Sequence, residues 1–212
     1  MTIFWLGQSA FKIVDKEVTI AIDPYDKIGL KMPKFQAEIA LITHDHDDHN
    51  NLEAIKGEPF IINNPGEYEV KNVFIYGIPG FHDNKEGSER GKITMYLIEM
   101  ESIKIAHLGD LGQQSLTAEQ LELLEGVDIL ILPVGGNFTI NGSEAVEIIS
   151  QIQPRIVIPM HYKIPGIDMK LESVDTFLKE FGVITPEKME KLKITKKDLP
   201  HEETKIIILE KT

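Results

Sequence analysis

The 212-residue sequence contains no cysteine. Disulfide bonds and thiolate metal ligands are therefore excluded, so any metal ion must be held by imidazole and carboxylate groups. No apolar run is long enough to cross a bilayer. The N-terminal stretch, MTIFWLGQSAFKIV, has no basic residue ahead of its apolar ones and is interrupted by polar side chains, which favours a β-strand over a signal peptide. We therefore expect a cytoplasmic protein without membrane contact.

Basic residues are also scarce. The chain has 22 Lys+Arg against 34 Asp+Glu, a formal net charge of −12. Proteins that bind the phosphate backbone of nucleic acids normally carry a basic stripe, so no nucleic-acid partner is expected. The charge does not exclude a small anionic substrate, because bound metal ions supply positive charge locally.

Short β-prone runs fill the first half of the chain, and strands alternate with helices in the second half. No repeat or linker separates the halves, so we expect a single α/β domain over residues 1–212, with sheets inside and helices outside. A cap at Thr117 opens one expected helix, a cap at Ser143 opens the next, and Gly182 closes the third. The expected helices are 116–124, 143–152 and 172–181, and the expected strands are 2–6, 10–14, 17–22, 39–42, 59–62, 68–70, 73–78, 92–99, 103–106, 127–132, 155–158 and 205–209.

The segment THDHDDHN, residues 43–50, contains a cluster of side chains that can bind metal ions. Three of the seven histidines, His44, His46 and His49, fall here together with Asp48. In an extended segment His44 and His46 point the same way, and after a turn Asp48 and His49 can face the same space. Imidazole and carboxylate are the ligands that borderline divalent metals prefer. Four such groups are too many for one four-coordinate ion with an open position, so the pattern predicts two ions.

An alternative interpretation of this segment is a solvated acidic loop ahead of a helix at 51–56. Asp47 or Asn50 would then only cap that helix. This interpretation does not account for three histidines placed directly after a buried-type strand.

The pattern H-x-H-x-D-H at a strand-to-helix junction resembles the metallo-β-lactamase-fold superfamily. Later motifs follow in the order of that superfamily: His82 in GFHD, Asp110 in HLGD and His161 in PMHY, with Asp23 in AIDP before them. The resemblance covers nearly the whole chain. It implies an αβ/βα four-layer sandwich, with two facing mixed β-sheets and helices outside.

The resemblance also implies a set of metal ligands. Zinc suits such histidine-rich sites, with manganese, iron or nickel as alternatives. Asp23 is expected to accept a hydrogen bond from a ligand imidazole and fix its tautomer. The implied ligands are His44, His46 and His82 for the first ion, Asp48, His49 and His161 for the second, and Asp110 as a bridge between them.

Four of these residues have simpler interpretations. His82 could be a surface histidine at the start of a charged loop, and His161 a core histidine. Asp110 and Asp23 could be turn residues, the latter in an Asp-Pro pair. Their places in the ordered series favour the metal site.

The opening WLGQSAFKI and the segment PVGGNFT, residues 133–139, resemble one branch of this superfamily. That branch contains small bacterial and archaeal metal-dependent hydrolases, including L-ascorbate 6-phosphate lactonase. Gln8 stands where relatives in the branch often have histidine, and neither Gln8 nor His107 is assigned a role. Gly135 and Gly136 are expected to let a tight backbone turn pass near the metals.

The resemblance implies a hydrolase that cleaves an ester, lactone or phosphoester of a small substrate. Hydroxide shared by two metals would be the nucleophile, and Asp48 would orient it and pass a proton to the leaving group. The loop DNKEGSER, residues 83–90, is expected to border the substrate mouth.

Three other functions are weighed against this one. A nuclease or RNA-processing enzyme on the same fold is disfavoured by the charge of −12 and the short chain. A di-iron redox protein with a flavin partner would replace one histidine of the cluster with a carboxylate, whereas His46 is present. A metal-binding protein with little turnover remains open.

Overall fold

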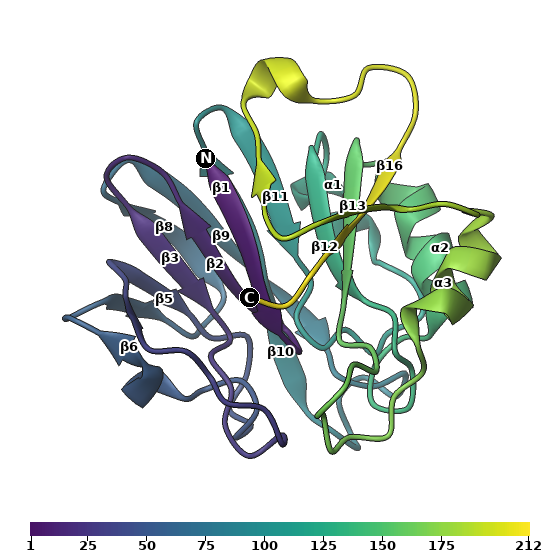
Figure 1. Ribbon diagram of the computed structural model, residues 1–212, viewed down its shortest axis with the longest axis horizontal. Helices are drawn as coiled ribbons and strands as arrows, with labels where there is room; N and C mark the ends of the chain where they lie inside the picture. The colour runs from purple at the N-terminus through teal and green to yellow at the C-terminus, as the bar shows by residue number, and fades with distance from the viewer.

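Two β-sheets packed face to face form the centre of the computed structural model, which describes residues 1–212 (Figure 1). The strand order is β15-β1-β2-β3-β5-β7 in the six-stranded sheet and β14-β16-β13-β12-β11-β10-β9-β8 in the eight-stranded sheet. Buried apolar residues from both sheets, between Met1 and Leu209, form the main core. The expected α/β architecture with two facing mixed sheets is confirmed.

The six-stranded sheet has an antiparallel part made of hairpins and a parallel part. Strands β1, β2 and β3 are antiparallel, whereas β3, β5 and β7 run parallel. The bounds are β1 Thr2–Gly7, β2 Ala10–Val14, β3 Thr19–Ile22, β5 Ile39–Leu41, β7 Phe60–Ile62 and β15 Leu192–Lys193.

The eight-stranded sheet has an antiparallel part, β8 to β11, and a parallel part, β11-β12-β13-β16 with β14. Strands β12 and β13 are buried at every position, because one face packs on the other sheet and the second face is covered by helices. The bounds are β8 Gly66–Val70, β9 Val73–Phe81, β10 Lys92–Met100, β11 Ile103–His107, β12 Ile129–Pro133, β13 Ile156–Met160, β14 Glu187–Met189 and β16 Lys205–Leu209.

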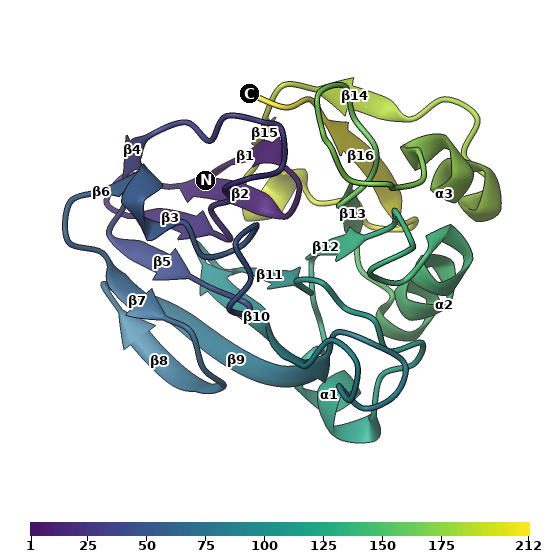
Figure 2. The same cartoon turned by 90° about the horizontal axis from the view of Figure 1, so that it is seen from below.

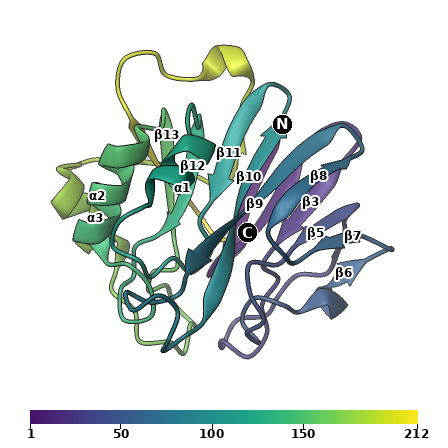
Figure 3. The same ribbon diagram turned by 180° about the vertical axis from the view of Figure 1, so that it is seen from behind.

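The three α-helices lie together on the outer face of the eight-stranded sheet (Figures 2 and 3). They are α1 Ala118–Leu123, α2 Gly142–Ile152 and α3 Val174–Phe181. None of them has the length and apolar character needed to cross a membrane. The outer face of the six-stranded sheet carries a thinner layer, the ladder of β4 Phe35–Gln36 and β6 Ile55–Lys56, which packs on Ala21.

Helix ends follow the capping signals, with two corrections. The N-cap of α2 is Asn141 rather than the expected Ser143, because Asn141 and Glu144 form a reciprocal capping box. Helix α3 begins after the N-cap Ser173, two residues later than expected. Gly182 ends α3 in the left-handed conformation, as expected.

Short elements differ most from the expectation. The segment at 51–56 is a single 3-10 turn, Leu52–Ala54, followed by β6, and not an α-helix. Strands β4, β14 and β15 were not expected at all. Each has only two or three residues, too few for an alternating pattern to be recognised.

Two contacts join the sheets beside the histidine-rich segment. The hydroxyl of Tyr96, on β10, donates to the carbonyl oxygens of Ile42 at 2.8 Å and Ile62 at 2.9 Å. The backbone N–H of Thr94 donates to the carbonyl oxygen of Thr43 at 2.8 Å. These bonds hold the end of β5 against β10, so the relative position of the two sheets is set where the THDHDDHN segment begins.

Replacing Tyr96 with phenylalanine tests this link. Tyr96→Phe leaves the carbonyl oxygen of Ile42 without its hydroxyl donor, whereas that of Ile62 keeps the backbone N–H of Ile42. We therefore expect the free energy of unfolding to fall by about 1–2 kcal/mol. Thermal denaturation measures the change. Tyr76→Phe, on the neighbouring strand β9 and partly exposed, is the control and should unfold like the wild type. Equal melting temperatures for Tyr96→Phe and the wild type would contradict the proposed link.

Candidate metal centre

The sequence-derived site residues all follow the ends of strands. Asp23 follows β3 and the THDHDDHN segment follows β5, both in the six-stranded sheet. His82, Asp110 and His161 follow β9, β11 and β13 of the eight-stranded sheet. Carboxyl ends of parallel strands gather at one edge, so residues distant in sequence meet there.

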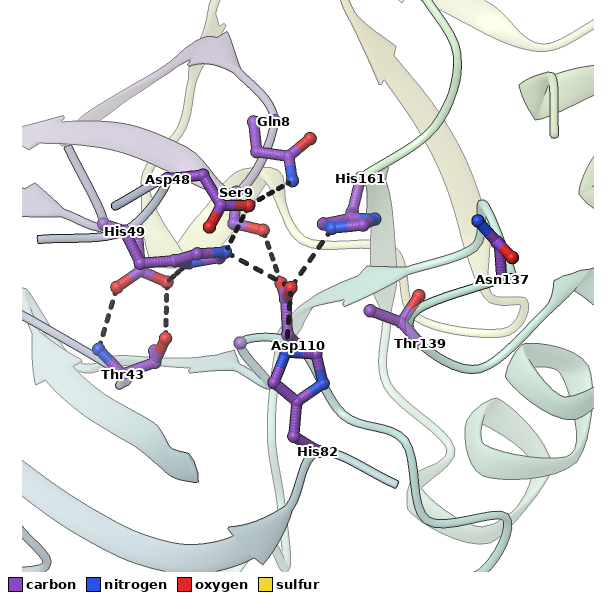
Figure 4. A network of polar contacts seen from close by, with 12 residues as sticks. Gln8, Ser9, Thr43, Asp48, His49, His82, Asp110, Asn137, Thr139 and His161 are labelled. Atoms are coloured by element: carbon purple, nitrogen blue, oxygen red, sulfur yellow. Dashed lines mark hydrogen bonds and ion pairs between the residues drawn. The ribbon is translucent and has the colours of Figure 1, made fainter. Parts of the chain in front are cut away.

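The structure brings the seven expected ligands into two groups. Figure 4 shows Asp48, His49, Asp110 and His161 together with His82. Within each group, one ligand atom from every residue lies within 4.8 Å of the others. The three-histidine group is His44, His46 and His82, and the four-residue group is Asp48, His49, Asp110 and His161.

Asp110 lies between the two groups. Its Oδ2 atom is 3.1 Å from Nε2 of His161 and 3.2 Å from Nε2 of His49, both in the four-residue group. The same oxygen is 3.6 Å from Nε2 of His82, in the three-histidine group. One carboxylate oxygen therefore faces imidazoles of both groups, as a bridging ligand requires.

The donor atoms fit divalent metal ions. Buried imidazole nitrogens in both groups have no hydrogen-bond partner, an arrangement that is costly unless something binds them. The rings are also close, with centroids 4.1 Å apart for His44 and His49 and 4.8 Å for His44 and His82. Imidazole with carboxylate and no thiolate is a donor set that suits zinc and its neighbours. Nε2 of His44, Nδ1 of His82 and Nδ1 of His161 have no partner. Nε2 of His49 and Nε2 of His161 face the Asp110 carboxylate without the alignment of a hydrogen bond.

Asp23 contacts the site where the sequence analysis expects it. Its Oδ2 atom is 2.9 Å from Nδ1 of His49, which leaves Nε2 of His49 facing Asp110. Asp23 also accepts the backbone N–H of Thr43 at 2.8 Å and the Thr43 hydroxyl at 2.7 Å. The Thr43 hydroxyl in turn lies 3.0 Å from Nδ1 of His44. One buried carboxylate thus orients a histidine in each group, and the sequence analysis assigned no role to Thr43.

Charges in the four-residue group shift its pKa values strongly. Burial disfavours the ionised form of Asp110, but His161 and His49 outweigh it and hold the pKa of Asp110 well below its usual range. Burial works against a charge on His49 too, yet Asp110 and Asp23 raise the pKa of His49 well above 6.5. Burial likewise opposes ionisation of Asp48, but its contact with His49 lowers the pKa of Asp48 to about 2. Two carboxylates therefore share the space with a histidine that retains its proton.

The three-histidine group behaves differently. Burial and the charge of His49 lower the pKa of His44 to about 3. Burial lowers the pKa of His82 as well. Neutral imidazole is the form that binds metal, so the lowered pKa values of His44 and His82 favour metal binding at neutral pH.

Two glycines allow the strand ends to approach closely. A Cβ atom on Gly135 would lie 2.1 Å from the carbonyl oxygen of His161, and one on Gly112 would lie 2.4 Å from the backbone of His82. No other residue fits at such distances. The expected role of Gly135 near the site is consistent with this packing, whereas Gly112 was not singled out from the sequence.

Several residues at the candidate metal centre have a strained backbone conformation. Asp23, His161 and Gln8 have φ values of 45°, 53° and 53°, in the left-handed region that non-glycine residues rarely adopt. Such conformations persist only where surrounding contacts hold them, and they are common at functional sites.

The loop at 83–90 is rigidly tied to its first residue. The buried carboxylate of Asp83 accepts the backbone N–H groups of Lys85, Gly87, Glu89 and Arg90 at 2.7–3.0 Å. Desolvation works against ionisation, but these four bonds outweigh it and lower the pKa of Asp83 to about 2. The loop therefore keeps its shape at neutral pH.

A small cavity of about 180 Å³ separates this loop from the segment after β12. His82 and Thr139 line it, together with Arg90 and Asn137. The guanidinium of Arg90 donates to the carbonyl oxygen of Asn137 at 3.3 Å and lies 5.0 Å from the ring centroid of Phe138. The cavity thus opens beside the three-histidine group, with a cation on its rim.

The two residues without an assigned role both lie at the site. Gln8 Nε2 donates to Asp48 Oδ2 at 3.3 Å. His107 is fully buried, with Nε2 3.0 Å from the carbonyl oxygen of Ser9, whose hydroxyl contacts Asp110. Ser9 follows Gln8 directly in the quoted opening motif, but no spacing rule links residues 9 and 110.

The raised pKa of His49 predicts proton release on metal binding. A raised pKa favours the protonated imidazole near neutral pH, and a metal ion takes the place of that proton, so zinc affinity should rise with pH from 6 to 8. We expect about one proton released per chain for this ligand at pH 7. Calorimetric zinc titration in buffers of different ionisation enthalpy measures the number. Heats that do not depend on the buffer would contradict the assignment.

Comparisons with known proteins identify the family of the chain. The family model described as "Beta-lactamase superfamily domain" matches residues 2–161. A UPF0173 metal-dependent hydrolase from Thermococcus onnurineus is 32% identical over 190 residues, covering 74% of this chain and 83% of that protein. Another from Staphylothermus marinus is 32% identical over 194 residues, covering 74% and 82%.

A solved structure matches over nearly the whole length. It is the crystal structure of a proposed Zn-dependent hydrolase of the metallo-β-lactamase superfamily from Thermotoga maritima. The TM-score is 0.81 at 32% identity, covering 98% of this chain and 97% of that one. The chain belongs to the metallo-β-lactamase superfamily and, within it, to the UPF0173 family of metal-dependent hydrolases.

Proposed function

We propose that the protein is a binuclear hydrolase that cleaves an ester, lactone or phosphoester bond of a small substrate. The observation that carries the proposal is the position of Asp110 Oδ2, within 3.6 Å of imidazole nitrogens from both ligand groups. A carboxylate oxygen shared in this way supports two neighbouring ions rather than one. Zinc is the favoured metal, in keeping with the Zn-dependent activity proposed for the Thermotoga maritima relative.

The assignment of ligands follows the two groups. His44, His46 and His82 would hold the first ion, and Asp48, His49 and His161 the second, with Asp110 between them. When bound, two such ions supply Lewis acidity and lower the pKa of water, which is the chemistry that hydrolysis at neutral pH needs. Asp23 would keep the proton of His49 on Nδ1, so that Nε2 stays available as a ligand atom.

We propose that Asp48 transfers the proton from water to the leaving group during hydrolysis. Its pKa of about 2 keeps the carboxylate ionised at neutral pH, and its side chain retains 21% exposure, unlike the fully buried His49. It can therefore reach both a water molecule and a substrate. The carboxylate accepts the proton from water and returns it to the leaving group of the substrate.

Metal content and turnover, measured together, test the proposal. We expect about two ions per wild-type chain, fewer in His46→Ala and Asp110→Asn, and loss of at least about 100-fold in kcat/KM in both. Elemental analysis gives the ions, and a screen of aryl esters, lactones and phosphodiesters gives the turnover. His201→Ala is the matched control, because His201 is an exposed histidine outside the site.

Three outcomes are informative. Two ions with hydrolysis of one substrate class would support the proposal. Two ions without turnover in any class would favour a metal-binding protein instead. Metal content unchanged in both variants would show that the ligand assignment is wrong.

The loop at 83–90 is proposed to choose the substrate. Asp83→Ala removes the acceptor of four backbone N–H groups, so the loop should lose its shape while the metal ligands stay in place. We expect KM to rise about tenfold, with metal content unchanged and a smaller effect on kcat. Steady-state kinetics on the best substrate measures both constants.

Asp198→Ala is the control for this prediction. Asp198 makes a similar local cap, accepting the backbone N–H and hydroxyl of Thr195, but lies outside the site. Its kinetic constants should match the wild type. Unchanged kinetics in Asp83→Ala as well would mean that the loop takes no part in substrate choice.

A further inference from the structure

The turn between β1 and β2 reaches into the candidate metal centre (Figure 4). Its two central residues, Gln8 and Ser9, are fully buried, although polar turn residues normally face solvent. Gly7 and Gln8 have φ values of 106° and 53°, so the turn holds a left-handed backbone. A buried, strained and polar turn calls for a role beyond joining two strands.

Ser9 fixes the plane of the Asp110 carboxylate. Its hydroxyl donates to Asp110 Oδ1 at 3.0 Å. The other oxygen, Oδ2, is then directed at His49 and His161. Tilting the carboxylate out of this plane would break the bond to Ser9, so the hydroxyl holds the group in one orientation.

Gln8 contacts the other carboxylate of the four-residue group. Its Nε2 donates to Asp48 Oδ2 at 3.3 Å, while its own Oε1 is buried without a partner. The reversed amide would place two oxygens together, so the contact with Asp48 selects the orientation seen. The backbone oxygen of Gln8 also accepts the backbone N–H of His161 at 3.2 Å and the indole N–H of Trp5 at 2.9 Å.

His107 anchors the turn to the strand that carries Asp110. Its Nε2 donates to the carbonyl oxygen of Ser9 at 3.0 Å, and its Nδ1 accepts the backbone N–H of Gly109 at 3.2 Å. Only the neutral ring with its proton on Nε2 makes both bonds. The imidazole therefore links the turn to the residue next to Asp110.

The hydrogen bonds of Gln8 and Ser9 to ligand residues fall in the four-residue group alone. They reach Asp48, Asp110 and His161 but no member of the three-histidine group. We infer that Gln8 and Ser9 are positioning residues for the second metal ion, because they orient its two carboxylates, Asp48 and Asp110. This inference rests on the proposed binuclear site.

Zinc titration of the metal-free protein tests the inference. Ser9→Ala removes the hydroxyl, and Gln8→Met removes the amide while keeping the length of the side chain. In each variant we expect the second Zn²⁺ to bind about 10–100-fold more weakly. The affinity for the first Zn²⁺ should be unchanged in Gln8→Met, and should fall less than that for the second in Ser9→Ala, because Asp110 also faces the first group. Titration calorimetry separates the two steps, and elemental analysis after dialysis confirms the occupancies.

Tyr25→Phe is the matched control. The buried Tyr25 hydroxyl donates to the carbonyl oxygen of Leu6 on β1, close to the turn, but Tyr25 makes no hydrogen bond to a ligand residue. This variant should have a lower melting temperature and bind both ions like the wild type. A general loss of stability is thereby separated from a selective loss of the second ion.

Three results would overturn the inference. The first is wild-type affinity for the second ion in both variants, and the second is equal weakening of both ions. The third is a wild-type protein that binds only one Zn²⁺.

Failure of the proposed hydrolase activity is distinguishable from these results. If the wild type with two ions turns over no substrate but the variants still lose the second ion selectively, the hydrolase proposal fails and the inference stands. If the wild type is active and the variants retain both ions, the inference alone fails.

Discussion

A carboxylate buried among imidazole rings is the interaction on which the centre depends. Asp110 is 2% exposed, and its ion-pair partners are His49, His82 and His161, with no lysine or arginine among them. An unpaired buried carboxylate is far too costly to persist. Its position therefore requires that strands of both sheets deliver imidazole and hydroxyl groups to the same point. Tyr96 and the Thr94–Thr43 backbone bond hold the two sheets in their relative position. The geometry of the site depends on that position.

The close approach of strand ends explains where the chain tolerates strain. Gly112 and Gly135 lie directly against the backbone of His82 and His161, at distances that no side chain allows. Asp23 and His161 adopt left-handed conformations despite having side chains. Packing of the two sheets supplies the energy that holds these residues in place, so the stability of the core and the geometry of the centre are coupled.

The centre and its rim are built by different means. The ligands stand at the ends of strands, where the sheets restrict their movement. The rim at 83–90 is held by one residue, Asp83, through bonds to its own loop. A change in the 83–90 loop can therefore alter the shape of the rim without moving the candidate ligands. The ligands alone do not name a substrate, because one fold can serve many reactions.

The sequence by itself determined the fold family, most strands and the composition of the centre. Clustered residues such as His44, His46 and His49 were recognisable because one turn places them together, and the long apolar runs of β12 and β13 are typical of buried strands. Only the tertiary structure decided the contacts of Ser9 and His107 and the packing of Gly112, because each joins segments far apart in the chain. Pattern and propensity act over a few neighbouring residues, whereas these contacts exist only once the two sheets pack face to face.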